Sequence, residues 1–200
     1  AGLDDAPTLT ETAGTMSGVQ VDLTPTGARR LFGVPMSELA GRTVAIEDLL
    51  GAGARELIGR VADARGWAAR FAVIDAWLLR RLAQPADRAI EHAWSVLFAS
   101  GGRAPIGALA KELGWSHRRL IARFRDQIGM APKQLARVIR FENVLEALRH
   151  GRGAPRWTEL ALDHGYYDQA HLIREVRALT GETPTELFAR LLPDLGGVAG

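Results

Sequence analysis

The side chains best equipped for chemistry are amide, imidazole and guanidinium groups that recur along one short stretch, residues 165–184. Gln169, His171, Arg174 and Arg177 fall on the polar face of a predicted helix of about a dozen residues. Groups of this kind hydrogen-bond to base edges and phosphates, and a short helix that presents them can read the major groove of DNA. The stretch therefore predicts a hydrogen-bonding recognition surface.

The opposite face of this predicted helix is apolar and would hold it against a core. Leu172, Val176 and Leu179 follow i, i+4, i+7 spacing, and Asp168 is a suitable N-cap. Helix-breaking residues bound the segment: Gly165 before it, and Gly181 and Pro184 after it. An apolar back, a polar front and a glycine turn at the entrance are what a major-groove helix requires.

An upstream stretch repeats this pattern. A short helix from Ile106 leads to Gly114, and Ser116 then caps a second helix whose Leu120 and Phe124 face inward. Glycine, an aromatic residue and a capping Ser or Asp occur in both turns, and each unit ends in glycine with proline three residues later. This internal repeat predicts two helix-turn-helix units, near residues 106–129 and 157–181.

One long predicted helix, residues 132–149, joins the two units. About 18 residues at 1.5 Å rise give a rod of about 27 Å. Successive turns of DNA are about 34 Å apart. A helix of this length could therefore set two reading helices one turn apart on the same side of a duplex.

Residues 106–188 resemble the DNA-binding domain of the AraC/XylS family of bacterial transcription regulators. The segment GYYDQAHLIREVRALTGETP is close to the family's signature, and both halves occur in order. Three positions depart from the family pattern: Leu172 and Val176 replace aromatic residues, and Ala122 stands where a basic residue is frequent. The resemblance implies a mainly α-helical double helix-turn-helix domain and the function of a sequence-specific transcription factor.

The resemblance also implies which side chains face DNA. Arg118 is the best candidate to pair with guanine in the first reading helix, and Arg174 occupies the corresponding polar face of the second. The implied base contacts are His117, Arg118, Ile121, Gln169, His171 and Arg174, with Ala122, Ala170 and Ile173 beside them. The implied phosphate contacts are Arg119, Arg123, Arg125 and Arg177, together with the helix N-termini capped by Ser116 and Asp168.

Residues 1–100 are expected to form a separate, partial regulatory or dimerisation region, and residues 101–192 the DNA-binding domain. The glycine-rich segment from Ser100 to Pro105 marks the boundary. Apolar and polar residues alternate over Val19–Leu23, which predicts a short strand. Helix caps and the spacing of apolar residues predict short helices from Thr24 to Leu50. Three longer helices should follow at 52–64, 67–82 and 86–99, the last with Ile90, Ala93, Trp94, Leu97 and Phe98 inward. The Val19–Leu82 stretch also resembles the region after the effector-binding barrel in some members, with most of that barrel lying outside this chain.

The predicted helix at 67–82 has a wide apolar stripe that includes Trp67, Phe71, Ile74 and Leu78. This stripe leaves two interpretations open. The helix is either buried in the core, or it also packs against a second protomer and makes the chain a homodimer.

Composition narrows the class of protein. The 200 residues contain no cysteine, which excludes disulfides and thiol catalysis and fits a cytoplasmic location. The five histidines show no zincin spacing and meet no acidic cluster, so no metal and no cofactor is expected. No apolar run is long enough to span a membrane, and no signal peptide is recognisable. Basic residues outnumber acidic ones after residue 100 and the reverse holds before it, which suits double-stranded DNA as a partner.

Two other classes of protein compete with a DNA-binding regulator. DNA alkyl-transfer enzymes carry similar domains, but they need a nucleophilic cysteine, so no enzyme is expected here. A protein-interaction adaptor that no longer reads DNA is the alternative, and Ala122 mildly favours it. For a regulator, the resemblance adds RNA polymerase and an unidentified small-molecule effector as candidate partners.

Overall fold

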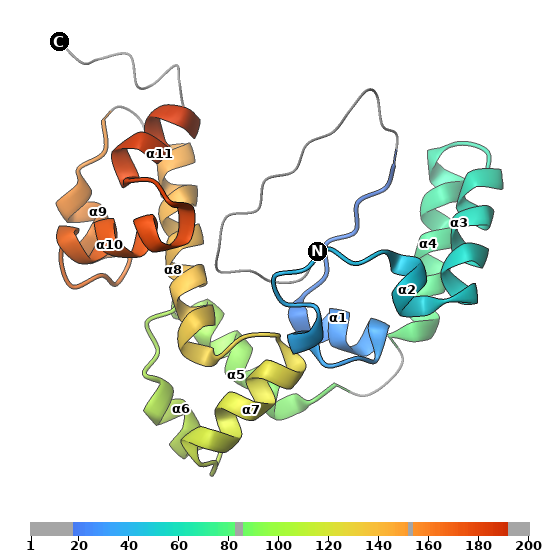
Figure 1. Cartoon of the computed structure of the whole chain (residues 1–200), viewed down its shortest axis with the longest axis horizontal. Coiled ribbons are helices and arrows are strands. Elements are labelled where there is room, and N and C mark those ends of the chain that lie inside the picture. Colours follow the sequence, from blue (N-terminus) through green and yellow to red (C-terminus); the bar gives the residue numbers. More distant parts are fainter. Residues whose placement is uncertain (1–17, 83–85, 152–153, 192–200) are drawn as a thin grey trace. The chain divides into compact units, whose positions relative to one another are not determined.

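A computed structural model of the chain describes residues 18–82, 86–151 and 154–191. These residues form eleven α-helices and one short 3-10 helix, and none of them lies in a β-strand (Figure 1). The prediction of a mainly α-helical fold is confirmed.

The short strand predicted at Val19–Leu23 is wrong. Residues 18–24 form no strand, because no other described segment offers a strand edge with which they could pair. Leu23 instead packs against the helical core of its own region, while Val21 is 43% exposed.

The chain divides into two compact units. The first contains the described residues between Gly14 and Glu91 together with Ile121–Met130, and the second contains His92–Leu120 and the described residues from Ala131 onward. Helices α5 (Arg88–Ala99) and α7 (His117–Gln127) contribute residues to both units.

Short and medium helices build the first unit before residue 91. They are α1 (Pro25–Phe32), the 3-10 helix η1 (Met36–Glu38), α2 (Ile46–Leu50), α3 (Ala52–Asp63) and α4 (Trp67–Arg81). Thr24 caps α1 by accepting a hydrogen bond from the Gly27 N–H at 3.1 Å, and Gly33 ends that helix with φ 74°. These helices match the predicted segments, because helix-breaking glycines lie at their ends: Gly33 after α1, Gly51 between α2 and α3, and Gly66 before α4.

Leu31, Leu57 and Trp77 form the buried cluster of the first unit, joining α1, α3 and α4. The stripe expected on α4 is therefore only partly buried. Trp77 is buried in this cluster and Val73 and Leu78 pack against it, whereas Trp67 and Phe71 remain 50% exposed.

Only some of the apolar residues predicted to face inward on α5 are buried. Ile90, Ala93 and Leu97 are fully buried as predicted, but Phe98 is 61% exposed, so its inward placement was wrong. Phe98 follows Leu97 by one residue, which turns it about 100° around the helix. It stacks on Trp94 instead, with ring centroids 5.2 Å apart.

The second unit is built around α8 (Pro132–His150). Helices α9 (Trp157–Asp163) and α10 (Gln169–Thr180) pack with α8 and α11 (Pro184–Leu191) through a continuous apolar cluster. Its buried members are Val144, Leu145, Leu148, Ala161, Tyr166, Leu172, Val176, Leu187 and Phe188. The short helix α6 (Ile106–Glu112) precedes α7 and buries Leu109 and Ala110.

Helix α11 is not among the predicted elements, because Pro184 indicates the end of the segment before it. Pro184 begins this helix instead, and proline is tolerated in the first turn. The Glu186 carboxylate accepts a hydrogen bond from the Thr183 N–H at 2.7 Å, and the Thr183 hydroxyl accepts one from the Glu186 N–H at 3.3 Å. This reciprocal capping box is visible in the sequence and could have revealed the helix.

Candidate nucleic-acid interface

The second helix-turn-helix unit consists of α9, a glycine turn and α10. Gly165 takes φ 78° after α9, and the Tyr166 N–H then donates to the Ala161 carbonyl at 2.9 Å. The Asp168 carboxylate accepts a hydrogen bond from the His171 N–H at 2.6 Å, which confirms Asp168 as the N-cap. Gly181 ends α10 with φ 80°, so both ends of this helix are fixed by local hydrogen bonds.

Two polar side chains on the front of α10 are oriented by neighbouring groups. The Thr158 hydroxyl donates to Gln169 Oε1 at 2.9 Å, so the Gln169 amide N–H groups remain available as donors. The Tyr167 N–H donates to His171 Nδ1 at 3.2 Å, which leaves Nε2 of the neutral ring as the protonated nitrogen. Both side chains are therefore presented as hydrogen-bond donors.

The two arginines on this front are exposed. Neither Arg174 nor Arg177 forms a salt bridge with any residue that the structure describes. Exposed guanidinium groups outside salt bridges suit acceptors on bases and phosphates.

An ion-pair network fixes the back of α10 to α8. The Arg137 Nε donates to both oxygens of Glu175, at 3.0 and 2.9 Å, and Arg140 Nη2 lies 3.6 Å from Glu175 Oε2. Arg140 Nη1 also donates to the Gly102 carbonyl at 2.9 Å. The Glu175 carboxylate is only 17% exposed, so this network tethers the reading helix from behind.

Tyr166 lies beside this network and is held in the neutral form. Burial raises the pKa of its phenol to about 12, although the positive charge of Arg140 acts in the opposite direction. The Arg140 guanidinium carbon lies 5.6 Å from the centre of the Tyr166 ring. Sequence reasoning missed the roles of Arg137, Arg140 and Glu175, because 38 residues separate the partners and no short motif joins them.

Nearby, burial lowers the pKa of His164 below its ordinary value of 6.5, with Asp163 raising it and Arg103 lowering it further. His164 follows α9 directly, and the Arg103 guanidinium donates to the Asp163 carbonyl at 3.2 Å. The turn before the second reading helix therefore contains a titratable group that resists protonation.

The first helix-turn-helix unit has the same local construction. The Trp115 N–H donates to the Ala110 carbonyl at 2.9 Å, matching the Tyr166 bond in the second unit. The Ser116 hydroxyl accepts from the Arg119 N–H at 3.2 Å, which confirms Ser116 as a cap. The Arg119 guanidinium lies over the Trp115 ring, 4.7 Å from its centre.

The front of α7 carries fewer oriented polar groups than that of α10. Arg118 and Arg125 are exposed and form no salt bridge with the described residues, and Ala122 between them is also exposed. Arg123 differs from them, because it is paired with Asp87 and lies 3.6 Å from Asp126. Two carboxylates therefore already compensate its charge.

The predicted contact residues fall into two groups by exposure. Ser116, His117, Arg118, Arg119, Arg125, Asp168, Arg174 and Arg177 are exposed, whereas Ile121, Arg123, Gln169 and His171 are half-buried. Within each reading helix the structure places these residues on or beside one polar face. The base and phosphate contacts assigned to these residues stay predictions.

The end of α7 packs within the first unit. Arg29 on α1 lies 3.8 Å from Asp126, and Ile128 is 2% exposed. A Cβ atom on Gly129 would lie 3.1 Å from the Met36 carbonyl oxygen, so the chain passes η1 closely at this point. Sequence reasoning missed this link between the first reading helix and the N-terminal helices.

The described part of the chain contains no group of three His, Asp or Glu side chains that could hold a metal ion. No described helix is both long and apolar enough to cross a membrane.

Comparison with known proteins identifies the class of the C-terminal region. Residues 109–190 match the family model described as "Helix-turn-helix domain". The match supports an AraC-type helix-turn-helix domain in these residues, and with it DNA binding and transcription regulation in general. The match covers less than half of the chain and does not reach the N-terminal helices. No curated protein and no solved structure gives a significant match.

Proposed function

We propose that the protein is a sequence-specific transcription regulator that inserts α7 and α10 into adjacent major grooves of one DNA site. The observation that carries this proposal is the repeated turn. In both units a residue after the glycine donates its N–H back to the preceding helix, and a capped helix with exposed arginines follows. Helix α8 has 19 residues, which corresponds to about 28 Å at 1.5 Å per residue, close to one turn of DNA.

The proposed base contacts differ between the two helices. In α7, Arg118 would pair with guanine, flanked by His117 and Ile121. In α10, the oriented donors of Gln169 and His171 would act together with Arg174. Because α10 presents more oriented donors, we assign it the larger share of sequence discrimination.

The proposed phosphate contacts surround these fronts. Arg119, Arg125 and Arg177 supply positive charge outside the salt bridges of the described residues, and the helix N-termini capped by Ser116 and Asp168 supply backbone N–H groups. Arg123 is the least suited of the predicted phosphate contacts, because its guanidinium already pairs with the carboxylates of Asp87 and Asp126.

We further propose that residues 1–100 act as a regulatory region, through a small-molecule effector or through dimerisation, and that residues 101–192 bind DNA. In this scheme the protein works in the cytoplasm, contacts RNA polymerase at promoters and catalyses no reaction. The position of Ile121–Met130 within the first unit supports a link between regulation and DNA binding.

A salt titration tests the proposal. Fluorescence anisotropy with a selected duplex should show affinity that falls steeply between about 50 and 200 mM salt, because each contacted phosphate releases counterions. Arg119→Ala should weaken binding to all duplexes alike, whereas Arg174→Ala should relax discrimination at one base pair by about 1–3 kcal/mol. Salt-independent binding, or no preference for any duplex, would instead favour the adaptor function.

A further inference from the structure

The first unit contains a large apolar cavity that the proposed DNA contacts do not use. It has a volume of about 600 Å³ and lies among α1, α3, α4 and the extended segment 18–23. Two tryptophans, Trp67 and Trp77, form part of its wall. Small-molecule sites in proteins are typically apolar cavities of about 300–1,000 Å³ with a few placed polar groups.

Among the described residues that line this cavity, Arg70 has the one charged side chain. Its Nε is buried and has no hydrogen-bond partner among the described residues, while its guanidinium carbon lies 5.0 Å from the centre of the Trp67 ring. A buried donor without an acceptor is unfavourable, and an incoming acceptor would remove this cost. The Trp67 ring offers only a weak electrostatic attraction at that distance, so an oxygen acceptor would still improve the environment of Nε.

We propose that this cavity binds a small molecule with an apolar body and a single carboxylate that accepts hydrogen bonds from Arg70. The apolar body would lie against Leu57, Val61 and Ile74, which face the cavity from α3 and α4. A carboxylate suits Arg70 because a guanidinium presents parallel N–H donors to its two oxygens.

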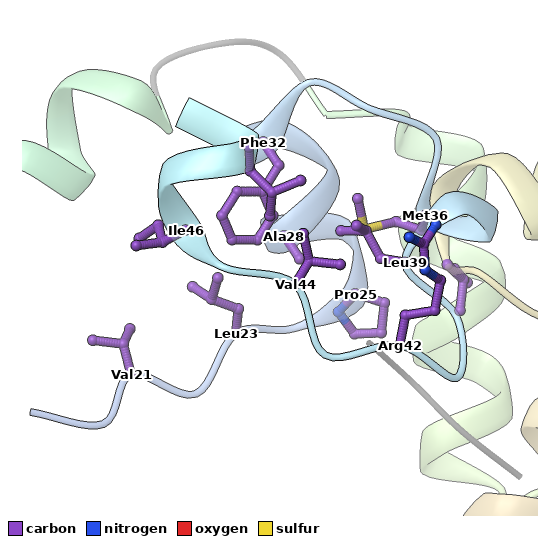
Figure 2. A pocket seen from close by; sticks show the side chains of 12 residues that line it. Val21, Leu23, Pro25, Ala28, Phe32, Met36, Leu39, Arg42, Val44 and Ile46 are labelled. Atoms are coloured by element: carbon purple, nitrogen blue, oxygen red, sulfur yellow. The ribbon is translucent and has the colours of Figure 1, made fainter. Parts of the chain in front are cut away.

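The cavity lies next to elements that reach the first reading helix. Leu31 and Phe32 of α1 line it, and Arg29 of the same helix pairs with Asp126 of α7. Figure 2 shows a smaller adjoining cavity of about 320 Å³, into which Phe32 and Leu23 also project. Ile128, just beyond α7, lines that second cavity. Any effect of the ligand on DNA binding rests on the proposed function, whereas ligand binding itself does not.

Calorimetric titration of the full chain with decanoate tests the site, with decan-1-ol as the uncharged ligand of equal chain length. We expect decanoate to bind more tightly than decan-1-ol. Arg70→Gln should weaken decanoate binding about tenfold, the loss of one charge-assisted hydrogen bond, and leave decan-1-ol binding unchanged. Arg80→Gln is the matched control, because Arg80 is exposed on the same helix and pairs with no described residue.

A cavity-filling variant keeps the test independent of Arg70. Ala62 is exposed and lines the cavity, so Ala62→Phe should fill the space without removing core packing and should abolish binding of both ligands. Circular dichroism and melting curves verify that each variant is folded.

Three outcomes would overturn the proposal. Decanoate could fail to bind the wild-type chain, or Arg70→Gln and Arg80→Gln could have equal effects. The chain could also sediment as a dimer that Ala62→Phe dissociates, which would show that a second copy fills the cavity. DNA affinity is measured separately without decanoate, so loss of the ligand site and loss of the DNA-binding function are distinguishable.

Discussion

The two reading helices have the same local construction but different surroundings. Helix α10 lies wholly within the second unit, where α8 and α11 cover its back and Glu175 joins it to Arg137. Helix α7 begins in the second unit but contributes its residues from Ile121 onward to the first, where Asp126 meets Arg29.

This difference shows that a repeated helix-turn-helix motif does not determine which residues pack behind each reading helix. The caps and glycine turns are local, so they recur in both units. The partners behind each helix are distant in sequence, and they make α10 depend on the DNA-binding region alone and α7 depend also on the N-terminal helices. We therefore expect regulation to act on the first reading helix.

The largest expected effect concerns the core behind α10. Leu172 is fully buried in the cluster that α8 and α11 share. Leu172→Ala should lower the free energy of unfolding by about 2–5 kcal/mol, through lost burial and the cavity left behind. Urea denaturation measures the loss, and hydrogen exchange should increase chiefly in residues 131–191. A loss of unfolding free energy well under about 1 kcal/mol would contradict the claim that α10 is held by the core of the second unit. Faster hydrogen exchange centred on α1 to α4 would contradict it as well.

The next effect concerns the ion pair behind α10. Glu175→Gln removes the charge that Arg137 and Arg140 share in a largely buried position. Unfolding free energy should fall by about 1.5–3 kcal/mol, the value for hydrogen bonds to charged groups.

Glu146→Gln provides the control for that measurement, because Glu146 is 63% exposed and its pairing with Arg149 spans 3.8 Å. Exposed pairs contribute about 0–1 kcal/mol, so this variant should be close to wild type. Equal losses for both variants would show that Glu175 does not anchor α10.

Much of the fold could be predicted from the sequence because its determinants are local. Asp168, Ser116 and Thr24 cap helices as expected, and Leu172 and Val176 are buried as the i, i+4 pattern indicated. Replacing aromatic residues at these two positions has not prevented burial.

The misses were of two kinds. Helix α11 was not predicted, although the Thr183–Glu186 capping box in the sequence indicates the start of a helix. The exposure of Phe98, the Glu175 network and the Arg29–Asp126 pair could not be predicted, since each depends on which segments pack together after folding. Hydrophobic periodicity shows that a helix has a buried face but not which partner covers it.

A smaller loss of stability is expected when the N-cap of either reading helix is removed. Asp168→Ala and Ser116→Ala each remove a bond to a first-turn N–H, and such losses cost about 0.5–2 kcal/mol. The Asp168 bond is shorter, 2.6 Å against 3.2 Å, and it is charged, so its loss should be the larger. Thermal unfolding of the two variants measures the difference, and a larger loss for Ser116→Ala would reverse the comparison.

The smallest effect is a pH dependence confined to the second unit. Because burial lowers the pKa of His164 in the folded state, the unfolded chain binds more protons as the pH falls below 6.5. The contribution of this residue to stability is therefore present at neutral pH and is lost as the pH falls through 6.5 towards the folded-state pKa. His164→Gln should flatten the decline in stability between about pH 7 and pH 5. An unchanged decline would show that other groups cause it.

The central claim is that α7 and α10 read two adjacent major grooves of one site. Selection from random duplexes, followed by affinity measurement on every single-base variant of the selected site, tests it most directly. Two clusters of sensitive base pairs should appear about 10 base pairs apart. Arg118→Ala should relax one cluster and Arg174→Ala the other, and inserting about five base pairs, half a turn, between the clusters should abolish tight binding. A single cluster, or two variants that relax the same base pairs, would contradict the claim.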